Sequence, residues 1–295
     1  MKVLITNNHL QHFGGTETWV VAVAEECKRR GFNVDIFSFY TSDVFKKEIF
    51  DRFNVFNTLE GMRKKYDLIL VNNNTCLEFL LNNGIQGKKI YTCHSVVANV
   101  EYPIKGADKY VAVSEEIQKF MKNKDFKAEL IFNGVNCSRF FPNLPIKDYP
   151  KKVLLISDYG DTAKIVMNAC LKLGLYCEIV GKLNPTAGIE KSMNEADIVI
   201  SLGRDCYEAM ACGRNVIVFD VRNYNGNRGD GIIEKDTLLQ MLRFNCSGRG
   251  FNYQFDEERM VSEIGKYRKE YGEFNRDFAL RNLNIENKVE QYLNL

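Results

Sequence analysis

Short apolar runs alternate with helical patterns along the chain, and this alternation predicts a parallel α/β sheet. In the first half the apolar runs are 3–6, 34–39, 68–71, 89–93, 110–113 and 129–132. The clearest helix is expected over residues 16–30, just before Gly31. Its apolar face consists of Val20, Val23, Ala24 and Cys27. Ser114 is a suitable N-cap for another helix that continues to Met121.

A second series of the same kind follows a proline-rich stretch. Residues 142–150 hold three of the five prolines and show no periodicity, so we expect the linker there. The later apolar runs are 152–156, 177–180, 197–202 and 215–219, with helices expected near 162–173 and 186–194. Residues 222–231 are polar and glycine-rich, which predicts a loop, and the tail from about 256 is helical in pattern. The pattern predicts an α/β fold with two Rossmann-like parallel-sheet domains that face a crevice.

Composition narrows the class of protein. The 295 residues are 45% hydrophobic and carry a net charge of +2, which gives no clear nucleic-acid signal. Small basic clusters at 63–65 and at Lys122, Lys124 and Lys127 are solvated faces or a weak membrane-surface contact. Nine cysteines without a Cys-x-x-Cys pair indicate thiols in a reducing compartment. We therefore expect a cytoplasmic protein, with peripheral contact at the inner membrane face as a further expectation.

One carboxylate stands out, because Glu208 lies on a short apolar helix between the strands 197–202 and 215–219. Ligands of parallel α/β sheets bind at the carboxyl ends of the strands. In the first turn of this helix, Glu208 would open onto that edge and could accept two hydrogen bonds from a ribose diol. Alternatively, it merely complements the helix dipole. The spacing alone leaves both interpretations open.

Gly14 and Gly15 follow the first strand and precede the first helix. Two glycines there allow backbone amides to approach a ligand closely, and a helix N-terminus favours an anion such as a diphosphate. A plain Gly-Gly turn is the alternative, since the full dinucleotide fingerprint is absent. The three histidines have no carboxylate cluster around them, so no metal site is predicted.

Several of these segments together resemble the family 4 glycosyltransferases, which have the two-domain GT-B fold. The matching stretches are Gly14-Gly15-x-Glu17, Val113-Ser114, Asn133-Gly134-Val135-Asn136, 208–218 and the closing segment 278–293. The resemblance implies domains at 1–143 on the acceptor side and 151–273 on the nucleotide-sugar side. It also implies a closing segment, 274–295, that packs back onto the first domain.

The resemblance further implies retaining transfer of a sugar from a UDP- or GDP-linked donor to an acceptor hydroxyl, with no metal and no cofactor. The acceptor is unknown: a glycan, a lipid-linked glycan, a protein or another molecule. Glu208 would hold the ribose and His94 the reacting sugar. Further donor-binding residues are Gly14, Gly15, Lys164, Gly203, Arg204 and Asp205.

The chain departs from the family pattern at three places. In the segment 157–164 the usual Arg is absent and Lys164 alone matches, so we expect Arg204 to replace that Arg. Ile200 stands where the first acid of the family's acidic pair belongs, and Asp205 is the candidate replacement. Asn136 stands in place of the usual Asp.

These departures keep alternatives open. One is a related GT-B enzyme such as a nucleotide-sugar 2-epimerase, which needs acid and base groups at the sugar ring. Another is a degenerate protein that binds a nucleotide sugar or glycan without turnover. A NAD-dependent dehydrogenase is disfavoured because Gly14 and Gly15 are not followed by a third glycine.

Overall fold

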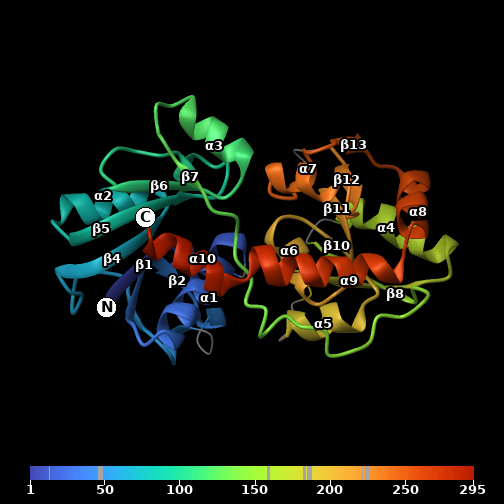
Figure 1. Ribbon diagram of the computed structural model, residues 1–295, viewed down its shortest axis with the longest axis horizontal. Coiled ribbons are helices and arrows are strands. Elements are labelled where there is room, and N and C mark those ends of the chain that lie inside the picture. The colour runs from blue at the N-terminus through green and yellow to red at the C-terminus, as the bar shows by residue number, and fades with distance from the viewer. Residues whose placement is uncertain are drawn as a thin grey trace. The chain divides into compact units, whose positions relative to one another are not determined.

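The chain forms two compact α/β units (Figure 1). The computed structural model describes residues 1–12, 14–45, 49–157, 160–181, 184, 188–220, 222 and 226–295. Unit 1 consists of Met1–Gly134 together with Ile285–Leu295, and unit 2 is Val135–Asn284. The expected linker, 142–150, lies within unit 2. Of the expected closing segment, only the last eleven residues, 285–295, belong to unit 1.

Unit 1 contains a seven-stranded sheet in the order β3-β2-β1-β4-β5-β6-β7. Every neighbouring pair is parallel, as the sequence predicts. The strands are β1 (Lys2–Leu10), β2 (Asn33–Thr41), β3 (Asn54–Phe56), β4 (Lys65–Asn72), β5 (Gln86–Cys93), β6 (Lys109–Ala112) and β7 (Glu129–Leu130). Their carboxyl ends therefore share one edge of the sheet.

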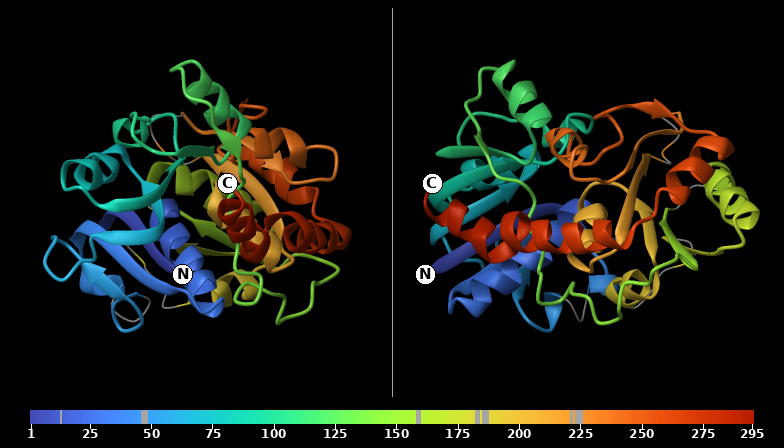
Figure 2. Two further views of the ribbon diagram at one scale, coloured as in Figure 1. Left: turned by 60° about the vertical axis from the view of Figure 1, so that its left-hand side comes forward. Right: turned by 45° about the vertical axis from the view of Figure 1, so that its right-hand side comes forward.

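Helices cover both faces of this sheet (Figure 2). One core lies against α1 (Gly15–Arg29) and α10 (Ile285–Leu293), the other against α2 (Asn74–Asn82) and α3 (Glu115–Lys122). The predicted apolar face of α1 is buried throughout. The predicted cap of α3 is confirmed, since the Ser114 hydroxyl accepts a hydrogen bond from the Ile117 N–H at 3.3 Å.

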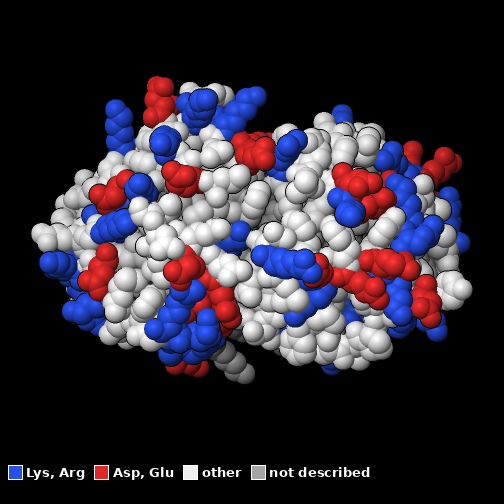
Figure 3. Space-filling view, in the orientation of Figure 1, with Lys and Arg blue, Asp and Glu red and all other residues white. Residues whose placement is uncertain are grey.

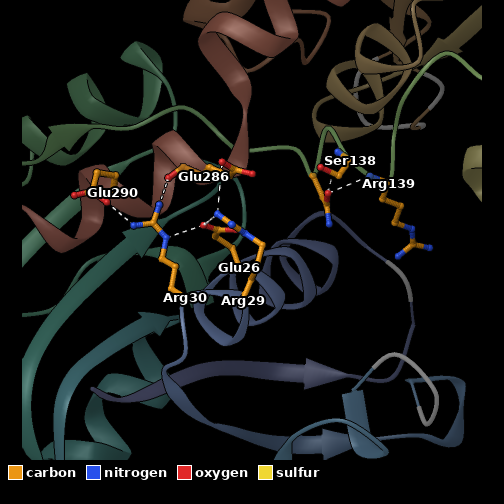
Figure 4. Close-up of polar contacts among 8 residues, drawn as sticks. Glu26, Arg29, Arg30, Ser138, Arg139, Glu286 and Glu290 are labelled. Atoms are coloured by element: carbon orange, nitrogen blue, oxygen red, sulfur yellow. Dashed lines mark hydrogen bonds and ion pairs between the residues drawn. The ribbon is translucent and has the colours of Figure 1, made fainter.

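The C-terminal helix α10 packs onto unit 1, which confirms the predicted return of this helix to the first domain. The Tyr292 hydroxyl lies 3.1 Å from the Thr92 hydroxyl, and its ring meets Trp19 edge-on. At the surface, Arg30 bridges Glu26 of α1 and Glu290 of α10 (Figure 4). Packing rather than these partly exposed ion pairs provides most of the attachment.

Unit 2 contains a six-stranded sheet in the order β13-β12-β11-β10-β8-β9. The strands are β8 (Lys152–Ile156), β9 (Tyr176–Val180), β10 (Ile198–Ser201), β11 (Asn215–Asp220), β12 (Arg228–Ile232) and β13 (Tyr253–Gln254). Neighbouring pairs among the first four strands are parallel, whereas β12 pairs antiparallel with both β11 and β13. Residues 223–225 of the expected loop 222–231 lie outside the described residues.

The loop prediction is wrong for 228–231, which belong to β12. The glycines at these positions allow neighbouring segments of the protein to approach closely, and they do not form a turn. A Cβ at Gly229 would lie 2.6 Å from the Val218 carbonyl oxygen, and one at Gly231 would lie 2.8 Å from a Glu263 carboxylate oxygen. A glycine-rich strand and a glycine-rich loop look alike in composition.

The helices of unit 2 include one between β10 and β11, as predicted. They are α4 (Gly160–Lys172), α5 (Ile189–Glu195), α6 (Arg204–Ala211), α7 (Leu238–Arg243), α8 (Glu257–Gly265) and α9 (Lys269–Phe278). One core of the unit lies between its sheet and the helices α4 and α8. On the face drawn in Figure 3, basic and acidic side chains are interspersed. None of the helices in the described residues is long and apolar enough to cross a membrane.

Close packing of α9 against the end of α6 can be tested at Gly272. A Cβ at this position would clash with the Gly213 carbonyl oxygen directly after α6. We expect Gly272→Ala to lower the free energy of unfolding by about 1–3 kcal/mol, because the backbones must move apart. Urea unfolding followed by circular dichroism measures the change.

Gly265→Ala is the matched control. Gly265 ends α8, and a Cβ there would meet nothing within 4 Å. This variant should be neutral or more stable by up to about 1 kcal/mol, because alanine favours the helix. Equal effects of the two substitutions would contradict the close packing.

Candidate functional site

The helix α6 begins at the carboxyl end of β10, where Gly203 redirects the chain. Gly203 has a φ of 57°, in the left-handed region that glycine adopts without strain, and its N–H donates to the Cys246 carbonyl at 2.8 Å. The helix therefore starts at Arg204, and Asp205 lies in its first turn. The prediction that Glu208 occupies the first turn is wrong, since it lies one turn later. Apolar periodicity located the helix but could not reveal this start.

Arg204 and Glu208 form a buried ion pair along α6. The Arg204 Nε donates to Glu208 Oε1 at 2.9 Å, and each side chain is only 4% exposed. Burial raises the pKa of Glu208 to about 7, while the positive charge of Arg204 acts in the opposite direction. Arg204 Nη1 is buried and has no hydrogen-bond partner among the described residues. Arg204 therefore keeps one strong donor that no described residue satisfies.

Asp205 adds a second carboxyl at the start of α6. The Ser201 hydroxyl, at the end of β10, donates to Asp205 Oδ2 at 3.2 Å. Part of the residue reaches the surface, yet its carboxyl lies deep enough for desolvation to raise its pKa. Gly203, Arg204, Asp205 and Glu208 are therefore brought together at one strand end.

The loop after α7 adjoins this strand end and was not identified from the sequence. The Tyr207 hydroxyl donates to Asn245 Oδ1 at 3.0 Å. Asn245 and Cys246 have φ angles of 54° and 46°, a conformation that non-glycine residues adopt at an energetic cost. Adjacent turn-forming residues at 245–248 were the available signal, but turn composition cannot reveal which helix a loop contacts.

Asp230 holds this same loop from within the sheet. Its Oδ1 accepts the N–H groups of Phe251 and Asn252 at 2.7 and 3.2 Å. Burial raises the pKa of Asp230, and the hydrogen bonds from the loop backbone oppose that rise. A carboxylate is thus used here to fix loop geometry.

Lys164 lies on α4, a different helix from the other candidates in unit 2, and is exposed. Residues 158 and 159 of the segment in which it was identified lie outside the described residues. No three His, Cys, Asp or Glu side chains of the described ranges are placed to hold a metal ion.

In unit 1, Gly14 is the N-cap of α1 and Gly15 is its first residue, and both are exposed. Neither needs a left-handed backbone, because Gly14 is extended with a φ of −135°. A Cβ at Gly14 would lie 2.6 Å from Glu17 Oε2, whereas one at Gly15 would meet nothing within 4 Å. The Glu17 carboxylate is the end of a flexible side chain that can move aside, so packing requires glycine at neither position.

His94 directly follows β5 at the same edge of the unit 1 sheet, and it is half-buried. Its Nε2 lies 3.1 Å from Asn72 Oδ1 at the end of β4, and Trp19 of α1 meets its ring edge-on. The imidazole is therefore held by neighbours from two other elements. Asn72 itself is fully buried.

Glu101 is the site residue that sequence reasoning missed in unit 1. It is 4% exposed, and its carboxylate accepts the His94 backbone N–H at 2.9 Å and the Asn73 side-chain amide at 2.9 Å. Burial and, to a smaller extent, the charge of nearby Glu17 raise the pKa of Glu101 to about 7, while the hydrogen bonds from His94 and Asn73 oppose the rise. A single acid in a loop carries no distinctive sequence signal.

Comparisons with known proteins identify the fold of the chain. No family model and no curated protein matches the chain. Solved structures do. Anabaena HepE, solved with UDP and glucose, is similar with a TM-score of 0.61, 14% identity, and coverage of 100% of this chain and 98% of that one. This chain has the GT-B fold.

Two further structures extend the comparison. A glycosyltransferase from Rickettsia africae has a TM-score of 0.61, 17% identity, and coverage of 99% of this chain and 97% of that one. A putative UDP-N-acetylglucosamine 2-epimerase from Listeria monocytogenes has a TM-score of 0.58, 11% identity, and coverage of 99% and 94%. At such identities the comparisons show the fold alone.

The buried state of Glu208 can be tested through the pH dependence of stability. Its pKa is about 7 in the folded protein, against an ordinary value of 4.5. The folded state therefore holds more protons between these values, and its stability falls as pH rises through this window. In Glu208→Gln this loss is absent. The variant should gain on the order of 3 kcal/mol relative to wild type between pH 4.5 and pH 8.

Urea unfolding at several pH values measures this difference. Glu273→Gln, at an exposed position of α9, makes the same chemical change at the surface and sets the baseline. If the difference in unfolding free energy between Glu208→Gln and wild type depends on pH as little as it does for this control, Glu208 ionises as it does in water.

Proposed function

We propose that this chain is a family 4 glycosyltransferase that transfers a sugar, with retention, from a nucleotide-diphosphate donor to an acceptor hydroxyl. The observation that carries the proposal is the buried Arg204–Glu208 pair at the carboxyl end of β10, with Arg204 Nη1 lacking a partner among the described residues. The GT-B fold and the UDP and glucose bound to HepE support a UDP-linked donor, and a GDP-linked donor is the second candidate.

Arg204 would hold the diphosphate of the donor. This group gains negative charge as the glycosidic bond breaks, and a preorganised guanidinium in a desolvated site stabilises that charge. Its planar fork can bond Glu208 through Nε and a phosphate oxygen through Nη1 at the same time. Lys164, on the exposed side of α4, would add a second positive charge to the diphosphate.

Glu208 would accept hydrogen bonds from the ribose hydroxyls. Two donated bonds and the guanidinium would together favour its ionised form, which burial alone opposes. Gly203 would allow close approach of the nucleotide to the backbone, and Asp205 would bind a hydroxyl of the donor. Nucleotide binding should therefore lower the pKa of Glu208.

Unit 1 would provide the remaining contacts. We propose that the backbone at Gly14 and Gly15 approaches the diphosphate and that His94 bonds a hydroxyl of the reacting sugar. The departing phosphate oxygen would accept the proton of the acceptor hydroxyl, which then attacks from the same side. The reaction so proposed needs no protein nucleophile, metal or cofactor. Positioning and electrostatics would provide the rate enhancement.

The acceptor would be a glycan, a lipid-linked glycan, a protein or another hydroxyl compound. All nine cysteines are free thiols and eight are buried, which supports a cytoplasmic location. Basic residues at 122–127 would add weak contact with an anionic membrane surface.

A nucleotide-sugar 2-epimerase is the second candidate, because the Listeria structure shares the fold. A binding protein without turnover is the third, because the family's Arg and first Glu are absent. The three differ in product. A transferase yields a glycosylated acceptor, an epimerase converts the donor sugar alone, and a binding protein changes neither.

Donor binding can be tested with Arg204→Lys. The lysine keeps the charge but loses the bidentate fork, so the affinity for the preferred nucleotide sugar should fall about 10- to 100-fold. Isothermal titration calorimetry with a panel of UDP- and GDP-linked sugars measures it.

Arg243→Lys makes the same change at an exposed position of α7 and should leave the affinity unchanged. Absence of binding by wild type to every member of the panel would overturn the proposed function. Equal affinities of wild type and Arg204→Lys would remove Arg204 from the site.

A further inference from the structure

One buried carboxylate fixes three strand ends of unit 1. Glu101 Oε2 accepts the backbone N–H of His94, which follows β5, at 2.9 Å. Its Oε1 accepts Asn73 Nδ2, which follows β4, at 2.9 Å. Asn73 Oδ1 in turn accepts the backbone N–H of Asn8 in β1 at 2.8 Å. The chain of bonds therefore runs along the carboxyl edge of the sheet.

The backbone at this edge needs such support. Asn73 has a φ of 70°, and non-glycine residues hold that conformation only where their surroundings impose it. His94 lies just beyond the end of β5, and its backbone N–H donates to the Glu101 carboxylate. Glu101 supplies the acceptor for that N–H and orients the amide of Asn73. Its own backbone is held as well, since Cys93 Sγ donates to the Glu101 carbonyl at 3.2 Å.

We infer that Glu101 is a positioning residue for the transfer reaction, which sets the backbone of His94 and the Asn73–Asn8 bridge at the acceptor-side edge of unit 1. This inference rests on the proposed function, because it takes His94 as the contact to the reacting sugar. Glu101 does not touch substrate. It acts through His94: by fixing the backbone of His94, Glu101 sets the orientation of the imidazole.

The charge state of Glu101 decides whether its carboxylate can accept the hydrogen bonds from the His94 backbone and the Asn73 side chain. An ionised carboxylate accepts both hydrogen bonds. In a protonated carboxyl one oxygen carries a hydrogen, which then faces a group that is itself a donor. Its pKa is about 7. Facing it are Glu17 of α1, Cys76 of α2, and Tyr91 and Cys93 of β5.

Of these neighbours, Glu17 supplies the negative charge that opposes ionisation of Glu101. Burial raises the pKa of the Cys76 thiol to about 12 and raises the pKa values of Tyr91 and Cys93 as well, so all three stay neutral near pH 7. Positioning should therefore improve as pH rises through about 7.

Glu101→Gln tests the inference in the full chain. The amide is nearly isosteric but presents an NH2 group to at least one of the two donors. We expect kcat at pH 8 to fall about tenfold while the dissociation constant for UDP stays within twofold. UDP is the probe because it lacks the sugar that His94 contacts.

The pH profile separates positioning from a merely structural role. Wild-type kcat should rise between pH 6 and pH 8 by more than the affinity for UDP changes over the same range. In Glu101→Gln this additional rise in kcat should be absent. Glu78→Gln, at an exposed position of α2, is the matched control and should leave both profiles unchanged. An unchanged kcat profile in Glu101→Gln would overturn the inference.

A measurement on wild type keeps the test decisive if the variant fails to fold. The side-chain amide signal of Asn73 in NMR spectra should shift with pH, with a midpoint near 7, because its acceptor changes charge. A signal that is flat from pH 5 to pH 9 would also overturn the inference. Failure of the proposed function gives a different result, since wild type would then bind no nucleotide whatever Glu101 does.

Discussion

A carboxylate buried beside a guanidinium at the carboxyl end of a parallel strand is the constraint around which unit 2 is arranged. Removing both ions of the Arg204–Glu208 pair from water costs several kcal/mol, and their attraction rarely returns more than it costs. Stability alone is therefore a poor explanation for the pair. A ligand that donates hydroxyls to Glu208 and places an anionic oxygen at Arg204 would satisfy both groups, including the Nη1 atom that lacks a partner among the described residues.

Unit 1 solves the same physical problem in another way. Glu101 is as deeply buried as Glu208, but its hydrogen-bond donors are a backbone N–H and a side-chain amide rather than a cation. Burial raises the pKa of both carboxyls to about 7. Their ionisation therefore responds to whatever approaches the two strand ends. A bound nucleotide would shift the ionisation of Glu208, whereas Glu101 would hold the local backbone.

Periodicity predicted most of the elements because a strand buried on both faces and an amphipathic helix have distinct spacings. The strands near 3–6 and 215–219, the α1 helix and the Ser114 cap all follow from such local signals. The loop prediction at 228–231 failed because its glycines serve close contacts with β11 and α8. That requirement comes from tertiary packing and leaves no local trace.

The candidate site was predictable only in part for the same reason. Glu208 was singled out because it belongs to a contiguous motif, and Arg204 because it lies just ahead of that motif. Their four-residue spacing brings them together on a helix. Glu101 was missed because its partners, His94 and Asn73, come from other strand ends and one of them is a backbone group. The register of the sheet, rather than any local pattern, brings these groups together.

The most direct test of the account is a crystal structure of the protein with UDP or GDP bound. In that structure the ribose hydroxyls should donate to Glu208, and Arg204 Nη1 should lie within hydrogen-bond distance of a phosphate oxygen. A nucleotide bound elsewhere, with the Arg204–Glu208 pair undisturbed and out of reach of it, would contradict the central claim.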